Sequence, residues 1–151
     1  MGEGGTFELN PDFQRGHVWT QAQQVAYVEN VLRGVAPVVF RFNHPSFFGR
    51  RAAAAGPDDL PPNQMTCIDG LQRITALRAF LAGDFKVFDR WYAKDLDGSA
   101  FSMARYRASF EVFNISTRSE LLSFYLDLNA GGTIHTDVEL DRVRALRAAA
   151  L

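Results

Sequence analysis

Residues 65–83 have the sequence MTCIDGLQRITALRAFLAG. The segment from Met65 to Ile68 is short and apolar, which predicts a buried strand. The apolar residues that follow recur at spacings of three, three and four residues, the pattern of one helical face: Leu71, Ile74, Leu77 and Leu81. Because glycine permits tight turns and ends helices, we expect a helix that begins near Gly70 and ends at Gly83.

The turn at Asp69 and Gly70 is a candidate anion-binding site. Backbone N–H groups in the first turn of a helix lack internal acceptors and lie at the positive end of the helix dipole. Arg73 can add a bidentate phosphate contact, and Asp69 is a candidate ligand for Mg²⁺ or for a water molecule. The alternative is an ordinary strand-turn-helix connection, in which Asp69 caps the helix and Arg73 is solvated.

A polar loop at residues 10–19, NPDFQRGHVW, follows a predicted strand at residues 6–9. Gln14 and Arg15 can contact a phosphate, and Trp19 beside them can stack on a base. In the alternative interpretation, the aromatic residues of this loop only fill the core.

Apolar periodicity and capping residues predict the remaining elements. These are a helix from Thr20 to Arg33, strands at 38–42, 85–88 and 111–115, and two final helices with capping boxes at Thr117/Glu120 and Thr136/Glu139. Residues 43–63 carry four of the six prolines and predict a long surface loop that is mobile and dispensable for folding. The pattern indicates an α+β fold, with a small mixed sheet and about four helices.

The loop between the last two helices contains Asn129, Gly131 and Gly132. A carboxamide followed by two glycines can approach a ligand closely, so these residues are candidates for nucleotide binding. They are equally consistent with a simple connector between helices.

Composition bounds the class of protein. A chain of 151 residues with 47% hydrophobic and 22% charged residues is consistent with one globular domain, here residues 1–151. A net charge of -1 gives none of the excess positive charge typical of dedicated nucleic-acid binders, and the single cysteine excludes an intrachain disulfide. Since no signal peptide or membrane-spanning run is evident, we expect a cytoplasmic protein. The sequence contains no Walker, HExxH or Gly-x-Ser-x-Gly motif.

Four segments occur in order between Leu9 and Leu140: NPDFQRGHVW, VENVLRGVAP, CIDGLQRITALRAFLAGDF and FYLDLNAGGTIHTDVEL. Together they resemble the DUF262 family, the ParB/sulfiredoxin-like domain of GmrS/GmrD-type restriction systems that act on modified DNA. The family pattern has a Gln-Arg-x-x-x-Trp loop, a helix ending before Gly-x-x-Pro, an Ile-Asp-Gly-Gln-Gln-Arg turn and a Leu-Asn-x-Gly-Gly segment. The resemblance implies a ParB-like nucleotide-binding domain.

The resemblance also implies that the family turn, here Asp69 to Arg73 with Leu71 in place of the first Gln, serves NTP hydrolysis or nuclease activity. In hydrolysis of GTP or another NTP, Arg73 neutralises charge on the transferred phosphoryl group, Asp69 binds Mg²⁺ and Gln72 positions the nucleophile. The alternatives are a metal-dependent DNA nuclease that uses the same residues and a non-catalytic module that responds to nucleotide.

Members of the family generally continue into a large helical region and often an HNH nuclease domain, whereas this sequence ends at Leu151. The last predicted helix has an apolar stripe of Leu140, Val143 and Leu146, which must be covered. We therefore expect a homodimer or a larger partner chain, with DNA as a further candidate partner.

Overall fold

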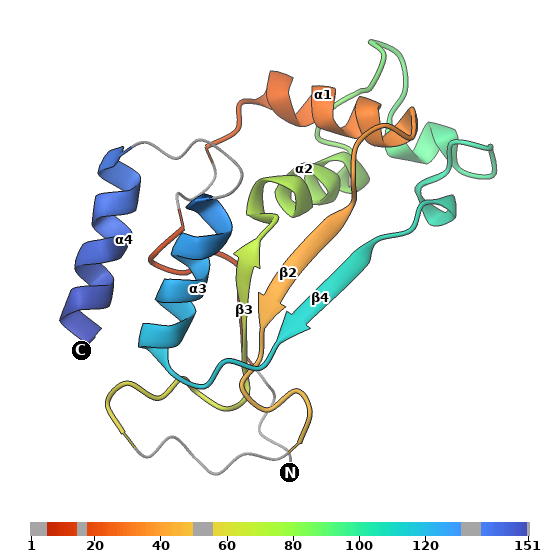
Figure 1. Ribbon diagram of the computed structural model, residues 1–151. Coiled ribbons are helices and arrows are strands. Elements are labelled where there is room, and N and C mark those ends of the chain that lie inside the picture. Colours follow the sequence, from red (N-terminus) through yellow and green to blue (C-terminus); the bar gives the residue numbers. More distant parts are fainter. Residues whose placement is uncertain (1–5, 15–17, 50–55, 131–136, 151) are drawn as a thin grey trace. The chain divides into compact units, whose positions relative to one another are not determined.

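The computed structural model describes residues 6–14, 18–49, 56–130 and 137–150. Its sheet is mixed and has the strand order β1-β3-β2-β4 (Figure 1). The four strands are β1 (Thr6–Glu8), β2 (Val39–Asn43), β3 (Gln64–Asp69) and β4 (Ser109–Phe113). Together with four α-helices in the described residues, the sheet forms the α+β fold that the sequence predicts.

Backbone hydrogen bonds fix the register of the outer strands. β1 runs parallel to β3, with Thr6 opposite Gln64. β4 runs parallel to β2, because pairing advances along both strands: Ser109 N donates to Val38 O at 2.8 Å, and His44 N donates to Phe113 O at 2.8 Å. The segment predicted as a strand at 111–115 therefore pairs two residues earlier in the chain, at 109–113.

The chain divides into two compact units, each built from segments that are far apart in sequence. The first comprises Met1–Arg15, Arg41–Ile68 and Val112–Leu151, and the second comprises Gly16–Phe40 and Asp69–Glu111. Each unit has its own buried side chains and is described by itself.

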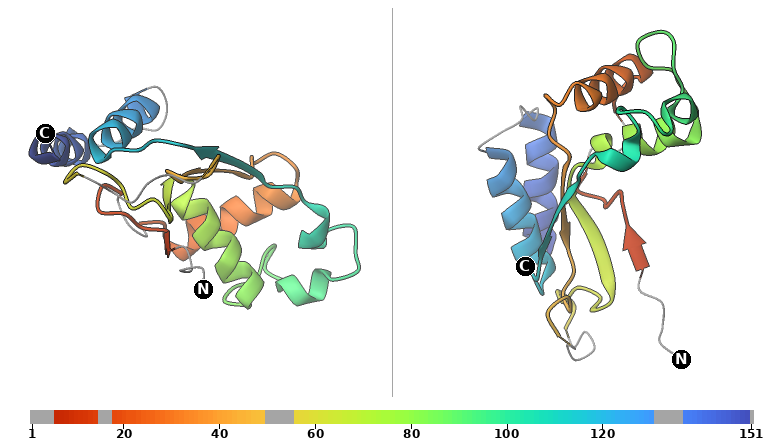
Figure 2. Two further views of the ribbon diagram at one scale, coloured as in Figure 1. Left: turned by 90° about the horizontal axis from the view of Figure 1, so that it is seen from below. Right: turned by 90° about the vertical axis from the view of Figure 1, so that its right-hand side faces the viewer.

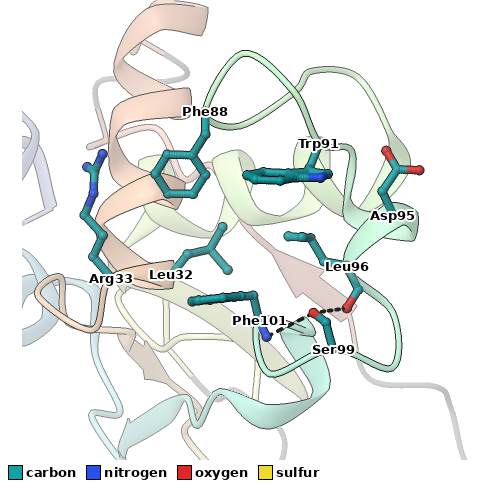
Figure 3. Close-up of a pocket in the computed structure, with 8 residues that line it drawn as sticks. All are labelled: Leu32, Arg33, Phe88, Trp91, Asp95, Leu96, Ser99 and Phe101. Atoms are coloured by element: carbon teal, nitrogen blue, oxygen red, sulfur yellow. Dashed lines mark hydrogen bonds between the residues drawn. The ribbon is translucent and has the colours of Figure 1, made fainter.

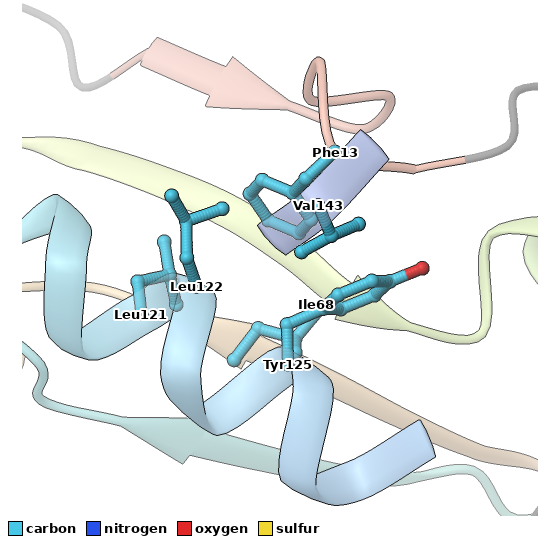
Figure 4. Packing of buried hydrophobic residues seen from close by; sticks show 6 residues of the cluster. All are labelled: Phe13, Ile68, Leu121, Leu122, Tyr125 and Val143. Carbon is cyan, nitrogen blue, oxygen red and sulfur yellow. The ribbon is translucent and has the colours of Figure 1, made fainter. Parts of the chain in front are cut away.

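In the first unit, α3 (Arg118–Ala130) packs against α4 (Asp137–Ala150), and both views of Figure 2 show the two helices side by side. The buried cluster beneath them (Figure 4) consists of Phe13, Ile68, Leu121, Leu122, Tyr125 and Val143. Burying one Leu or Phe side chain contributes roughly 1.5–3 kcal/mol to stability. Val143 is 3% exposed and Leu146 packs on the same cluster, so this part of the apolar stripe is covered within the unit. The side chain of Leu140 lies outside the described residues.

The predicted loop at 43–63 is fixed at its ends. Asn43 belongs to β2 and is 1% exposed, and its side chain exchanges two hydrogen bonds with the backbone of Ile115, at 3.0 and 2.7 Å. Near the other end, Leu60 N donates to Ser116 O at 2.9 Å. The loop therefore begins after Asn43, because a buried carboxamide that satisfies a strand backbone is part of the core. Residues 50–55 lie outside the described ranges.

The second unit is built around α1 (Gln21–Leu32) and α2 (Leu71–Ala82), which pack against each other. Thr20 caps α1 as predicted, and Gln23 completes a capping box with it. Gly70 and Gly83 flank α2, both in the left-handed conformation, with φ of 103° and 84°. The predicted beginning and end of this helix are confirmed. Two short 3-10 helices follow, η1 (Ala93–Leu96) and η2 (Met103–Arg105).

Three expectations from the sequence are wrong in detail. Residues 85–88 form no strand, because Phe88 and Asp89 adopt left-handed φ angles of 51° and 53° and turn the chain back to an isolated bridge between Val87 and Trp91. Leu81 is 59% exposed, while its neighbour Phe80 is buried. Asn129 lies inside α3 and not in a loop.

Candidate functional site

The turn between β3 and α2 has a geometry that only glycine fits. Gly70 is the N-cap of α2, and an added Cβ would lie 2.8 Å from Cδ1 of Phe40 and 3.3 Å from the carbonyl oxygen of Val39. Because glycine has no side chain, the first N–H groups of the helix receive no side-chain cap. The beginning of α2 therefore keeps the donors that attract an anion.

Asp69 and Arg73 form an ion pair across this turn. Nη2 of Arg73 donates to Oδ2 of Asp69 at 2.8 Å, and the two side chains are 21% and 39% exposed for Arg73 and Asp69 respectively. Since the guanidinium has two further nitrogens, Arg73 can hold the carboxylate and still donate to an oxyanion. Asp69 does not cap the helix, contrary to the alternative considered from sequence.

Gln72 binds the segment that leads into α1. Its Oε1 accepts hydrogen bonds from the backbone N–H groups of Val18 and Trp19, at 3.1 and 3.2 Å. The indole of Trp19 in turn packs on the ring of Tyr27, with 5.4 Å between ring centroids. Gln72 thus holds Trp19 near the beginning of α2, which the sequence did not indicate.

Tyr27 connects this packing to the charge at the turn. Its hydroxyl donates to Pro37 O at 2.9 Å. Burial raises the pKa of the Tyr27 phenol above its usual range, and the positive charge of Arg73 partly offsets that rise. The phenol is therefore a neutral donor at ordinary pH and has no role as a base.

The other predicted ligands lie elsewhere in the chain. Gln14 belongs to the first unit, and its Nε2 donates to the carbonyl oxygens of Cys67 and Ile68, at 3.2 and 2.7 Å. Asn129, in the same unit, donates to Tyr125 O one turn earlier in its own helix, at 2.7 Å. Three further candidates lie outside the described residues: Arg15, Gly131 and Gly132. The structure thus gathers Trp19, Asp69, Gly70, Gln72 and Arg73 in the second unit.

A metal at this turn would depend on oxygens from its ligand. No group of three or more His, Cys, Asp or Glu side chains suitable for a metal occurs in the described ranges. Mg²⁺ often uses only one or two carboxylates together with phosphate oxygens and water, so Asp69 alone fits that chemistry. Within the same ranges, no helix has the length and apolar character needed to cross a bilayer.

A second concave feature of the second unit was not predicted. It is a cavity of about 530 Å³ with mostly apolar walls, and its lining includes Phe88, Trp91 and Phe101. Its residues come from the end of α1 and from residues 88–101. The only signal in the sequence was the density of aromatic residues in that stretch, which periodicity does not interpret.

The fold and the turn define a small α+β protein with a candidate anion site where a strand meets a helix. Residues 2–138 match the family model described as GmrSD restriction endonuclease, N-terminal domain, and this chain belongs to that family. The resemblance seen in the sequence is thereby confirmed, and the family associates the chain with restriction and defence systems. Comparisons with curated proteins and with solved structures give no match.

Proposed function

We propose that the chain binds a nucleoside triphosphate at the beginning of α2 and hydrolyses it, with GTP as one candidate. The observation that carries this proposal is the turn itself: a helix beginning capped only by Gly70, next to the Arg73–Asp69 ion pair. Backbone donors and a guanidinium together suit the negative charge of phosphates. Membership in a restriction endonuclease family supports a hydrolytic reaction at phosphorus.

Each residue of the turn has a role in this proposal. The N–H groups after Gly70 hold the phosphates, and Arg73 stabilises charge that develops on the transferred group. Asp69 holds Mg²⁺ or orients the attacking water. Gln72 positions the nucleophile through its amide group and keeps Trp19 in place for stacking on the base. Gln14, Arg15 and Asn129, with Gly131 and Gly132, complete the ligand pocket.

A metal-dependent DNA nuclease is the second candidate, because the family is described as a restriction endonuclease. The same turn would then hold a phosphodiester, and Arg73 would stabilise the charge on its oxygens. The two reactions differ in product: NTP hydrolysis releases phosphate, and nuclease activity nicks DNA.

Arg73→Ala tests the site directly. We expect nucleotide affinity to fall by roughly 1.5–3 kcal/mol, since one charge-assisted contact is lost. Folding stability should fall by less than about 1 kcal/mol, because the Asp69 pair is partly exposed. Arg78→Ala is the matched control, since Arg78 is an exposed arginine of the same helix. Binding is measured by calorimetry with the four NTPs in Mg²⁺, and stability by urea denaturation.

The outcomes separate the candidates. Phosphate release without DNA nicking supports NTP hydrolysis, and metal-dependent nicking supports the nuclease. Saturable binding without turnover reduces the function to a nucleotide-responsive binding module. If Arg78→Ala weakens binding as much as Arg73→Ala, or if no NTP binds at millimolar concentration, the turn is not the site.

A further inference from the structure

We propose that the aromatic cavity of the second unit is a separate ligand site, which takes a planar aromatic ring carrying an anionic group. It contains none of the residues assigned to the phosphate-binding turn, so the inference does not rest on the proposed function. A volume of about 530 Å³ is in the range of small-molecule sites.

The walls of the cavity favour a flat ring. Figure 3 shows the rings of Trp91 and Phe101 both edge-on, one on either side of Leu32 and Leu96. Phe101 is 54% exposed although it is a large apolar residue. Two aromatic faces with aliphatic side chains between them offer stacking surfaces to a planar ligand.

The backbone that carries Phe88 is held in a strained form at the cavity wall. Phe88 and Asp89 have φ of 51° and 53°, a conformation that costs a residue other than glycine free energy. Oε1 of Glu29 accepts a hydrogen bond from Phe88 N at 2.6 Å. The guanidinium of Arg33 lies 4.9 Å from the Phe88 ring centroid, and its Nη2 lies 3.9 Å from Oε2 of Glu29. These contacts fix the ring at the wall, and strain of this kind concentrates at ligand sites.

Opposite charges lie at the two ends of the cavity. In Figure 3, Arg33 and Asp95 lie on opposite sides of the aromatic rings. The Arg33 side chain is 53% exposed, and a second guanidinium, that of Arg90, lies 4.9 Å from the Trp91 ring centroid. Asp95 accepts a hydrogen bond from Tyr92 N through Oδ2, at 2.9 Å, while its Oδ1 takes none from any described residue. The cavity therefore suits a ring with an anionic group toward Arg33 and a hydrogen-bond donor toward Asp95.

The cavity and the turn lie at opposite ends of α1. Trp19, just before the helix, is bound to Gln72, whereas Leu32 and Arg33 at the other end line the cavity. A helix of 12 residues is about 18 Å long, at about 1.5 Å per residue. Ligands at the two places are therefore independent, and removing one site leaves the other intact.

Nucleoside monophosphates and aromatic carboxylates share the chemistry that the cavity offers. The test is calorimetric titration of the full chain with AMP, GMP, CMP, UMP and indole-3-acetate, with ribose 5-phosphate as the non-aromatic control. We expect at least one of the aromatic anions to bind and ribose 5-phosphate not to bind. Binding of the nucleotides alone identifies a nucleobase ligand, and binding of indole-3-acetate alone identifies an aromatic acid.

Variants locate the binding. Phe101→Ala should weaken affinity at least about fivefold, the low end for one base–aromatic stack. Phe110→Ala should leave it unchanged, because Phe110 is a comparably exposed phenylalanine of the same unit outside the cavity. Arg73→Ala should also leave it unchanged, which distinguishes this site from the turn. Arg33→Gln should weaken nucleotide binding more than binding of the parent nucleoside.

Several results would overturn the proposal. One is that none of the aromatic anions binds at millimolar concentration. Others are binding of ribose 5-phosphate as tight as that of the nucleotides, equal affinities for wild type and Phe101→Ala, and loss of binding in Arg73→Ala alone. Arg33→Gln changes a half-exposed side chain, so it keeps the test open if Phe101→Ala unfolds.

Discussion

Gly70 combines two constraints that a comparison of glycines can separate. Gly70→Ala puts a Cβ 2.8 Å from Phe40 and a side chain at φ 103°, so we expect a loss of roughly 1–3 kcal/mol of folding free energy. Gly83→Ala has the second constraint without the first, because nothing lies within 4 Å of its added Cβ. Urea denaturation should show the larger loss for Gly70→Ala; equal losses would mean that the approach of β2 to the turn does not matter.

Gln72 is expected to contribute to structure as well as to ligand binding. Gln72→Ala removes the acceptor for two backbone N–H groups and should cost roughly 1 kcal/mol of stability. Gln72→Glu keeps carboxylate oxygens in the same place and should retain most of that stability. Chemical denaturation of both variants checks this, and equal destabilisation would contradict the structural role.

The residues of the turn differ in how well sequence alone identifies them. Asp69, Gly70 and Arg73 are adjacent along the chain, so the spacing of strand and helix sufficed to place them together. The bond from Gln72 to residues 18 and 19 joins positions 53 and 54 residues apart, and local pattern carries no such information. For the same reason, sequence did not show that Gln14 binds the carbonyl oxygens at the end of β3.

At the scale of elements, the beginning of α3 is capped from two parts of the chain. Thr117 Oγ accepts from Glu120 N at 3.3 Å, and Oδ1 of the distant Asp58 accepts from Ser119 N at 3.2 Å. Asp58→Ala should therefore cost about 0.5–2 kcal/mol, the range for a lost helix cap. Asp84→Ala is the control, because Asp84 is exposed on the surface. Thermal melts that coincide for the two variants would exclude the second cap.

Helices were easier to predict than the connections between them. Thr20, Thr117, Gly70 and Gly83 give local signals, and the structure confirms each of them as a helix boundary. Residues 85–88 resemble a strand in composition, but the side chain of Glu29 binds Phe88 N and holds the chain in a turn. Such a long-range bond overrides β propensity, which is itself dependent on context.

At the scale of the molecule, self-association stays a prediction with a different basis. The buried Val143 and Leu146 give no reason for a dimer. Phe47 and Phe48, 50% and 74% exposed and in edge-to-face contact, form an apolar surface that a second copy can cover. We expect a mass near twice 16.9 kDa by light scattering, and near 16.9 kDa for the Phe47→Ser/Phe48→Ser variant. A monomeric wild type at tens of micromolar would contradict the expectation.

The two compact units consist of five chain segments, which alternate between them and so require four crossings. Neither unit is a continuous stretch that can be cloned, swapped or inherited alone, so shuffling of gene segments cannot transfer the phosphate turn without the rest. Their order in sequence also makes folding depend on contacts between distant segments, a feature that slows folding in small proteins. A protein synthesised from its N-terminus can complete neither unit until residues beyond 111 have emerged, and both then form late and nearly together.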